Sequence, residues 1–278
     1  MPTHISWRHR LVAQYYRTPE HRGHLRLLNL LKDVLHINSV RVEVSPGVVM
    51  ELDDRDYVQR EILFKGGYEP ATLALFDRLV ASARGCLDIG AHHGQYALRA
   101  ARSLAERGGR VVAVEPSPAN GAALLRNADL SSLTNIDLFT CALARERAVM
   151  ELAQPQPGNS GGTRLFQEGY RQQEGPTVHV AVHPFSDIAH LVPETALDLV
   201  KIDVEGLEGQ MLTSLFATGA RPRHIVLEYI PTAFDYGLGE SIPVWLTSRR
   251  YRVRTIAGID YHPEVAIPEG NLWAEAQS

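Results

Sequence analysis

The pattern of apolar and polar residues changes about one fifth of the way along the chain. Over residues 25–35 apolar side chains recur at helical spacing. Over residues 40–52 they alternate with polar ones on either side of Pro46-Gly47, a dipeptide typical of tight turns. We therefore predict a helix followed by a β-hairpin, which together form an N-terminal accessory segment of residues 1–60.

From residue 69 onward, short apolar runs alternate with segments of helical periodicity. Runs such as RVVAVE and HIVLEY are almost continuously apolar, which is typical of strands buried on both faces. This alternation predicts an α/β domain over residues 61–278, built on a doubly wound, mainly parallel sheet. The predicted strands are 85–89, 110–115, 136–142, 197–204 and 224–229, and the predicted helices are 70–83, 95–106, 118–128 and 208–216.

One segment interrupts this rhythm. Residues 155–176 are rich in Pro, Gly, Gln and Ser, and they separate two short β-like pieces, 149–153 and 177–182. A loop of this length inside a compact domain is either functional or disordered. Near the C-terminus, residues 251–256 and 271–274 are predicted to add two strands at one edge of the sheet.

Composition narrows the classes of partner. The chain has 278 residues and a formal net charge of -4, which gives no electrostatic reason to expect nucleic acid. Cys86 and Cys141 both lie in apolar runs, so we interpret them as core residues in a reducing compartment. The sequence shows neither a signal-peptide pattern nor an apolar run of about 20 residues, so we expect a cytoplasmic protein without a membrane partner.

The most specific motif is CLDIGAHHGQY, residues 86–96. A strand ends near Asp88, and Gly90 and Gly94 then form the turn that leads into a helix. Glycines let a backbone approach a ligand closely, and open α/β sheets bind ligands at the carboxyl ends of their strands. The motif predicts a nucleotide-type ligand, with a plain strand-to-helix turn as the alternative.

The next predicted strand ends at Glu115, which Pro116 follows. An acidic residue in this place can accept hydrogen bonds from both hydroxyls of a ribose. The loop reads G-A-H-H-G, which lacks the G-x-G-x-x-G spacing of dinucleotide sites. Asp88 would repel a pyrophosphate and attract the ammonium of a methionine moiety, so the pattern favours S-adenosylmethionine over NAD.

A second motif, LDLVKIDVEGLEG, covers residues 197–209. In a strand, Lys201, Asp203 and Glu205 would project to one face. Charges in a buried strand are costly unless they are paired or lie at a binding edge. We therefore predict that these three residues form the floor of an active site, with a structural lysine–carboxylate network as the alternative.

Glu228 ends the following strand and brings a further carboxylate to the same rim, or it is a solvated strand end. Clustered carboxylates can bind a divalent cation. Lys201 would repel such an ion, so we predict that no metal is bound.

Taken in order along the chain, these pieces resemble the FkbM-type methyltransferases over about residues 57–230. The pieces that carry the resemblance are YEP (68–70), LDIGAHHG (87–94), VEPSPAN (114–120) with Asn127, DLVKIDVEG (198–206) and IVLE (225–228). The resemblance implies a class I, Rossmann-like methyltransferase fold with S-adenosylmethionine as cofactor. The implied cofactor-binding residues are Glu69, Asp88, Gly90, Ala91, Gly94, Glu115, Pro116 and Ala142, of which Ala142 would lie against the adenine. His92 and His93 depart from the usual family pattern.

Members of this family mostly methylate hydroxyl groups of sugars or secondary metabolites, so the resemblance implies O-methyl transfer to a small molecule. A hydroxyl must lose its proton, and we predict Asp203 as the general base, oriented by Lys201 and Glu205, with His183 as an alternative base. An amine acceptor would suit the same residues. Two other classes stay open: an NAD-dependent oxidoreductase, and a binding protein that has the pocket without the chemistry.

The acceptor itself leaves no clear signature in the sequence. We expect its pocket to involve the 155–176 loop, the N-terminal segment and residues 229–239, where several aromatic side chains occur. For assembly we expect a homodimer, with the N-terminal segment serving as an arm or a lid.

Overall fold

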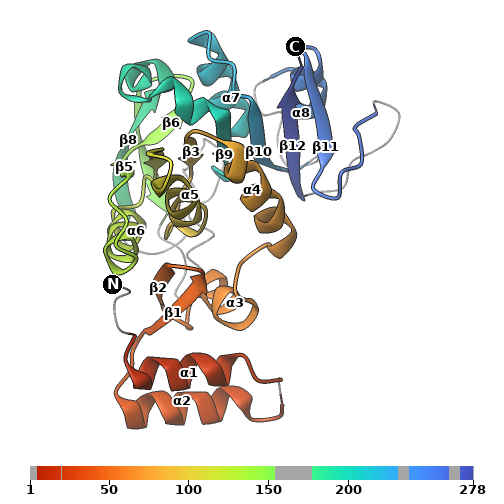
Figure 1. Ribbon diagram of the computed structural model, residues 1–278. Coiled ribbons are helices and arrows are strands. Elements are labelled where there is room, and N and C mark those ends of the chain that lie inside the picture. The colour runs from red at the N-terminus through yellow and green to blue at the C-terminus, as the bar shows by residue number, and fades with distance from the viewer. Residues whose placement is uncertain (1–4, 20, 154–176, 231–237, 263–269, 278) are drawn as a thin grey trace.

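A seven-stranded sheet forms the centre of the computed structural model, which describes residues 5–19, 21–153, 177–230, 238–262 and 270–277 (Figure 1). Its strand order is β11-β12-β10-β9-β3-β4-β5. The five strands from β10 to β5 run parallel, whereas β12 pairs antiparallel with both β10 and β11. This confirms the predicted doubly wound, mainly parallel sheet. The strands are β3 (Cys86–Ile89), β4 (Val111–Val114), β5 (Ile136–Phe139), β9 (Leu199–Ile202), β10 (His224–Tyr229), β11 (Tyr251–Thr255) and β12 (Gly270–Ala276).

Apolar side chains cover both faces of this sheet. On β4, Val111 and Ala113 belong to one core cluster, and Val112 and Val114 belong to the other. Each strand therefore packs on helices from both sides, which is why its sequence is continuously apolar. The helices of the main body are α4 (Pro70–Ser82), α5 (Gln95–Ala105), α6 (Pro118–Leu130), α7 (Glu208–Ala217) and α8 (Ile242–Thr247), with short 3₁₀ helices at Phe185–Asp187, Ala189–Leu191 and Glu194–Asp198. Within the described ranges, no helix combines the length and apolarity needed to cross a membrane.

The N-terminal part contains the predicted helix and hairpin together with two helices that the pattern did not predict. Its elements are α1 (Trp7–Tyr16), α2 (His24–Leu35), β1 (Val40–Ser45), β2 (Val48–Leu52) and α3 (Tyr57–Lys65). The hairpin lies between the α1–α2 pair and the main body (Figure 1). One buried cluster includes Val12, Leu28 and Met50 together with Phe76 and Leu98, so the hydrophobic core is continuous across residue 60.

The predicted strand 136–142 is divided in the structure. Its first part is β5 at the edge of the main sheet, and Ala142 begins β6 (Ala142–Ala144), which pairs with β8 (Thr177–Pro184). With β7 (Ala148–Ala153) these strands form a second sheet, in the order β6-β8-β7. Because β5 is an edge strand, the chain can leave the main sheet there and find a new partner in β8. The predicted functional loop 155–176 lies outside the described residues.

Candidate functional site

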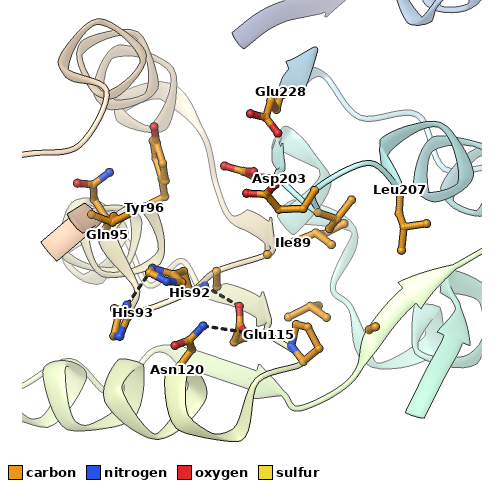
Figure 2. A pocket seen from close by; sticks show the side chains of 18 of the residues that line it. Ile89, His92, His93, Gln95, Tyr96, Glu115, Asn120, Asp203, Leu207 and Glu228 are labelled. Carbon is orange, nitrogen blue, oxygen red and sulfur yellow. Dashed lines mark hydrogen bonds between the residues drawn. The ribbon is translucent and has the colours of Figure 1, made fainter. Parts of the chain in front are cut away.

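A cavity of about 340 Å³ lies at the carboxyl ends of β3, β4, β9 and β10. This volume is within the usual range for small-molecule sites, roughly 300–1,000 Å³. Figure 2 shows side chains from these strand ends converging on it. Eight of the residues predicted from the sequence line the cavity: Glu69, Gly90, Ala91, Glu115, Pro116, Ala142, Asp203 and Glu205.

The glycine turn after β3 is shaped by the neighbouring strand. The amides of Gly90 and Ala91 donate to the carbonyl of Val114, at 2.9 and 3.0 Å. Gly90 has a φ of +85°, and a Cβ atom there would lie 1.7 Å from the carbonyl oxygen of Asp203. The position therefore requires glycine, because the chain leaving β9 passes directly against it. Gly94, with φ +94°, directly precedes α5 and packs against Leu124 of α6 and Leu98 of α5 rather than lining the cavity.

Glu115 is held at the end of β4 by three hydrogen bonds. One carboxylate oxygen accepts from the amide of Ser117 at 2.8 Å and from the side chain of Asn120 at 3.3 Å, and the other accepts from the amide of His92 at 2.8 Å. A carboxylate has about four acceptor positions, so one of them remains for a ligand hydroxyl. Burial raises the pKa of Glu115, while these three hydrogen bonds act in the opposite direction and favour the ionised form.

Asp88 and Lys201 lie behind the cavity wall and do not line it. They are register neighbours on β3 and β9, with exposed fractions of 1% and 0%. Burial raises the pKa of Asp88 to about 7, and the charge of Lys201 opposes this shift. The Asp88 carboxyl is thus buried beneath the sheet edge, and its contact with a cofactor ammonium stays a prediction.

The buried Lys201 holds Asp203 of the active-site floor in place. Its Nζ donates to Oδ2 of Asp203 at 2.9 Å and lies 5.2 Å from the centre of the Tyr96 ring. Burial alone would lower the pKa of Lys201, but the carboxylates of Asp203 and Glu69 raise it above its usual value. The ammonium is therefore charged and anchors Asp203, which fits the structural-network interpretation of this lysine.

Three carboxylates meet at one end of the cavity. Oxygen atoms of Asp203, Glu205 and Glu228 all lie within 4.8 Å of one another. Burial raises the pKa of Glu228 to about 8, and the charges of Asp203 and Glu205 add to this effect. We call this group, Asp203, Glu205 and Glu228, the acidic end of the cavity. The expectation that no metal binds here stays a prediction.

The loop that carries Glu205 is fixed by Glu208 at the start of α7. The Glu208 carboxylate accepts from the amides of Val204 and Gly206 at 3.1 to 3.2 Å and is almost fully buried. Glu205 itself has a φ of +53°. Among six described non-glycine residues with positive φ, three line the cavity: Glu69, His92 and Glu205. Backbone strain of this kind concentrates at functional sites.

Glu69 connects the cavity to β12, in the antiparallel part of the sheet. Its carboxylate accepts from the side chain of Asn271 on β12 at 2.8 Å and from the hydroxyl of Tyr96 at 3.2 Å. The Gln95 side chain bonds both the amide and the carbonyl of Tyr68, the residue before Glu69. The start of α4 is thereby fixed against the start of α5.

Part of the cavity wall comes from α3, which crosses the predicted boundary at residue 60, and the sequence pattern indicated no specific residues there. Tyr57, Val58 and Ile62 of α3 line the cavity. The Asn127 side chain accepts from the amide of Glu51 at 2.8 Å and donates to the carbonyl of His93 at 3.1 Å. These bonds join the hairpin, α6 and the glycine turn.

The three histidines considered from the sequence have different locations. His92 and His93 line the cavity, and their Nδ1 atoms lie 2.8 Å apart. Burial lowers the pKa of His93 to about 3, so that its ring is neutral. His183 on β8 does not line the cavity, and its Nδ1 lies 3.0 Å from the Asp187 carboxylate. The structure therefore does not bring His183 together with Asp203.

The residues around the cavity fit S-adenosylmethionine better than NAD. Glu115 retains an acceptor position for a ribose hydroxyl. The acidic end would attract the cationic groups of S-adenosylmethionine and repel a pyrophosphate. From the sequence, Asp88 was expected to favour S-adenosylmethionine over NAD in this way. In the structure the carboxylates that line the cavity are Glu69, Glu115 and the three of the acidic end.

Several solved structures are similar to this chain at low identity. An O-methyltransferase from Bacillus cereus in complex with SAH is 15% identical, with a TM-score of 0.46, and the match covers 76% of this chain and 82% of that one. A methyltransferase FkbM from Methylobacillus flagellatus KT is 16% identical, with a TM-score of 0.41 and coverage of 96% and 58%. The O-methyltransferase TomG from Streptomyces achromogenes, in complex with SAM, is 15% identical, with a TM-score of 0.46 and coverage of 81% and 88%. These likenesses are too weak to transfer a residue's role to this chain.

A comparison with curated proteins found no match. The family model described as the methyltransferase FkbM domain matches residues 88–253, which is more than half of the chain. The match includes the glycine turn, Glu115 and the acidic end. The chain therefore belongs to the FkbM methyltransferase family, and its cofactor is S-adenosylmethionine.

Proposed function

We propose that the protein methylates a hydroxyl group of a small molecule such as a sugar or a secondary metabolite. The observation that supports this most is the arrangement of carboxylates in one cavity, with Glu115 at one end and Asp203, Glu205 and Glu228 at the other. A hydroxyl group must lose a proton to become methylated, and carboxylates at the acidic end are suited to take it.

The cofactor would be held mainly by residues of the first two strand ends. Glu115 would accept a hydrogen bond from the ribose, and Gly90 and Ala91 line the same cavity. Pro116 and Ala142 line the cavity on the side proposed for the adenine, and Glu69 also lines it. When bound, S-adenosylmethionine supplies an electrophilic methyl group.

The protein's own contribution is to bind, to orient and to move a proton. Lys201 fixes Asp203 through the 2.9 Å hydrogen bond, so that the floor of the acidic end is rigid. Holding an acceptor in a near-attack position can supply a large part of the rate enhancement. From the sequence, Asp203 was the predicted general base, and the structure adds Glu228 as a rival for that role.

Calorimetric titration with S-adenosylmethionine, S-adenosylhomocysteine and NAD tests the cofactor side. We expect saturable binding of the first two ligands, and their affinity should fall in Glu115→Gln. A thermal-shift assay provides the control, because a ligand at 100 times its Kd stabilises a fold by about 2.7 kcal/mol. Binding of NAD alone would contradict the assignment.

The acceptor side requires a transfer assay. Wild-type protein and labelled S-adenosylmethionine would be incubated with matched panels of small sugars, phenols and amines, and the product bond identified by mass spectrometry. Methyl ethers would support the proposal. Methylation of amines alone would favour the N-methyltransferase alternative, to which the same carboxylates are suited.

A further inference from the structure

Glu228 and Asp203 have different environments although they face each other across the acidic end. Figure 2 shows Glu228 at the end of β10, with its carboxyl group directed toward Asp203. Asp203 is bonded to the Lys201 ammonium at 2.9 Å. Glu228 lines the same cavity, and its buried Oε2 has no hydrogen-bond partner among the described residues.

An anchored carboxylate is a poor acceptor for a proton. Protonation of Asp203 would leave the buried Lys201 ammonium without its closest counter-charge. In contrast, protonation of Glu228 removes a negative charge from a group of three. Glu228 therefore offers an incoming proton a buried carboxylate oxygen with no other partner among the described residues, whereas Asp203 is held by the lysine.

We infer that Glu228, rather than Asp203, is the general base that takes the proton of the acceptor hydroxyl. This inference rests on the proposed function and identifies the residue that removes the proton. The O–H bond of the acceptor breaks, its oxygen forms a bond to the transferred methyl group, and the electron pair of the old methyl–sulfur bond stays on sulfur. The proton moves to the carboxylate of Glu228 and is later released to solvent.

Charge balance agrees with this assignment. Methyl transfer removes one positive charge from the sulfur and would remove one negative charge from Glu228, so the net charge in the cavity is unchanged. In a site of low dielectric constant, this avoids creating an uncompensated charge. Asp203, bonded to the Lys201 ammonium, acts with that lysine as a positioning residue.

The groups facing Glu228 determine how its protonation varies with pH. They are Asp203, Glu205 and Lys201 from β9 and the loop after it, Glu208 from α7, and Tyr68 before α4. On β12 its register neighbour is Asn271, which does not titrate. Burial and the three carboxylates raise the pKa of Glu228 to about 8, whereas Lys201 lowers it. A base with a pKa near the working pH is effective in proton transfer.

The first measurement uses the protein without cofactor. In a ¹³C NMR titration of carboxyl-labelled protein, wild type should show a carboxyl group that titrates with a midpoint near 8. This signal should be absent in Glu228→Gln and present in the exposed control Glu194→Gln. In Asp203→Asn it should move to lower pH, because Lys201 then has only the remaining carboxylates as partners. An unchanged signal in Glu228→Gln would overturn the inference.

The second measurement is kcat/KM for methyl transfer as a function of pH. For wild type it should rise with pH toward a plateau above about 8, following ionisation of Glu228. Glu228→Gln should lose activity at least about 100-fold, with no remaining rise in that range, while binding S-adenosylhomocysteine normally. If Asp203 is the base, Glu228→Gln will retain activity. A wild type that binds the cofactor but methylates no hydroxyl in the panel would instead disprove the proposed function.

Discussion

The carboxylates at the two ends of the cavity have opposite surroundings. At the Glu115 end, three donors hold one buried carboxylate in a fixed position. At the acidic end, three carboxylates lie within 4.8 Å of one another and a single lysine contacts one of them. The first arrangement lowers the cost of binding, because the receiving group is already oriented. The second places groups with altered protonation where a proton has to move.

This difference also shows which part of the cavity lowers the stability of the folded protein. Like charges brought together without full compensation reduce stability, and natural proteins accept such costs mainly at functional sites. The acidic end carries this cost, as the raised pKa of Glu228 indicates. At the Glu115 end burial also raises the pKa of the carboxylate, but three hydrogen bonds act against that shift.

The largest expected effect comes from Gly90→Ala, which should disrupt both ends together. A Cβ atom would lie 1.7 Å from the Asp203 carbonyl oxygen, and the backbone has a φ of +85°. We expect the free energy of unfolding to fall by about 3 kcal/mol, measured by urea denaturation. Gly66→Ala is the matched control, because Gly66 has a φ of +77° with nothing within 4 Å. It should cost only about 1 kcal/mol, and equal losses would refute the steric argument.

Asp203→Asn should change the acidic end alone, and so lower turnover without lowering cofactor affinity. We expect turnover to fall about 100-fold, because Lys201 loses its partner and the floor of the site is no longer fixed. Cofactor affinity should stay within about tenfold, or roughly 1.4 kcal/mol. Rapid mixing for turnover and calorimetry for affinity would check both values. Near-normal turnover would show that Asp203 has no part in the reaction.

Glu115→Gln should instead lower cofactor affinity and leave turnover nearly unchanged. The amide nitrogen of glutamine cannot accept from the backbone donors, so cofactor affinity should fall about 30-fold, or roughly 2 kcal/mol. Turnover at saturating cofactor should change little. Asn120→Ala removes only the long 3.3 Å bond and should weaken affinity by about threefold or less. If the two variants have the same affinity, the backbone donors do not determine the position of Glu115.

A further expected effect is a change of stability with pH at the acidic end. The pKa of Glu228 is about 8 in the folded protein, against 4.5 for an ordinary glutamate. A raised pKa means that the folded state binds more protons between these values, so stability should fall as pH rises from about 5 to 8. Urea unfolding across this range should show a weaker dependence for Glu228→Gln. Asp88, whose pKa is about 7, should leave part of the slope.

Local motifs were sufficient to predict the centre of the fold and the Glu115 end. The glycine turn and the acidic residue after the next strand are determined by neighbours in sequence, and the structure brings Gly90, Ala91 and Glu115 to one cavity. The continuous apolar strands also predicted burial on both faces correctly.

Features that depend on distant packing were not predictable in the same way. Strand alternation placed Lys201 beside Asp203, but it could not show that Lys201 lies behind the wall while Glu228 lines it. Helix α1 is rich in polar residues, and α3 is short, so their periodicity is weak. Ala142 was predicted in the main sheet, and its pairing with Val182 became visible only with β8 in place.

The two hydrogen bonds of the Asn127 side chain limit how chimeras between members of this family can be made. The matched family region begins at residue 88. Asn127 inside this region accepts a hydrogen bond from the backbone amide of Glu51 outside it, and residues of α3, also outside it, line the cavity. A gene fragment trimmed to the matched region would encode a chain with an open wall and an exposed core. The N-terminal part therefore cannot be exchanged on its own, and a chimera would have to keep its hairpin and α3 together with the asparagine that bonds the hairpin.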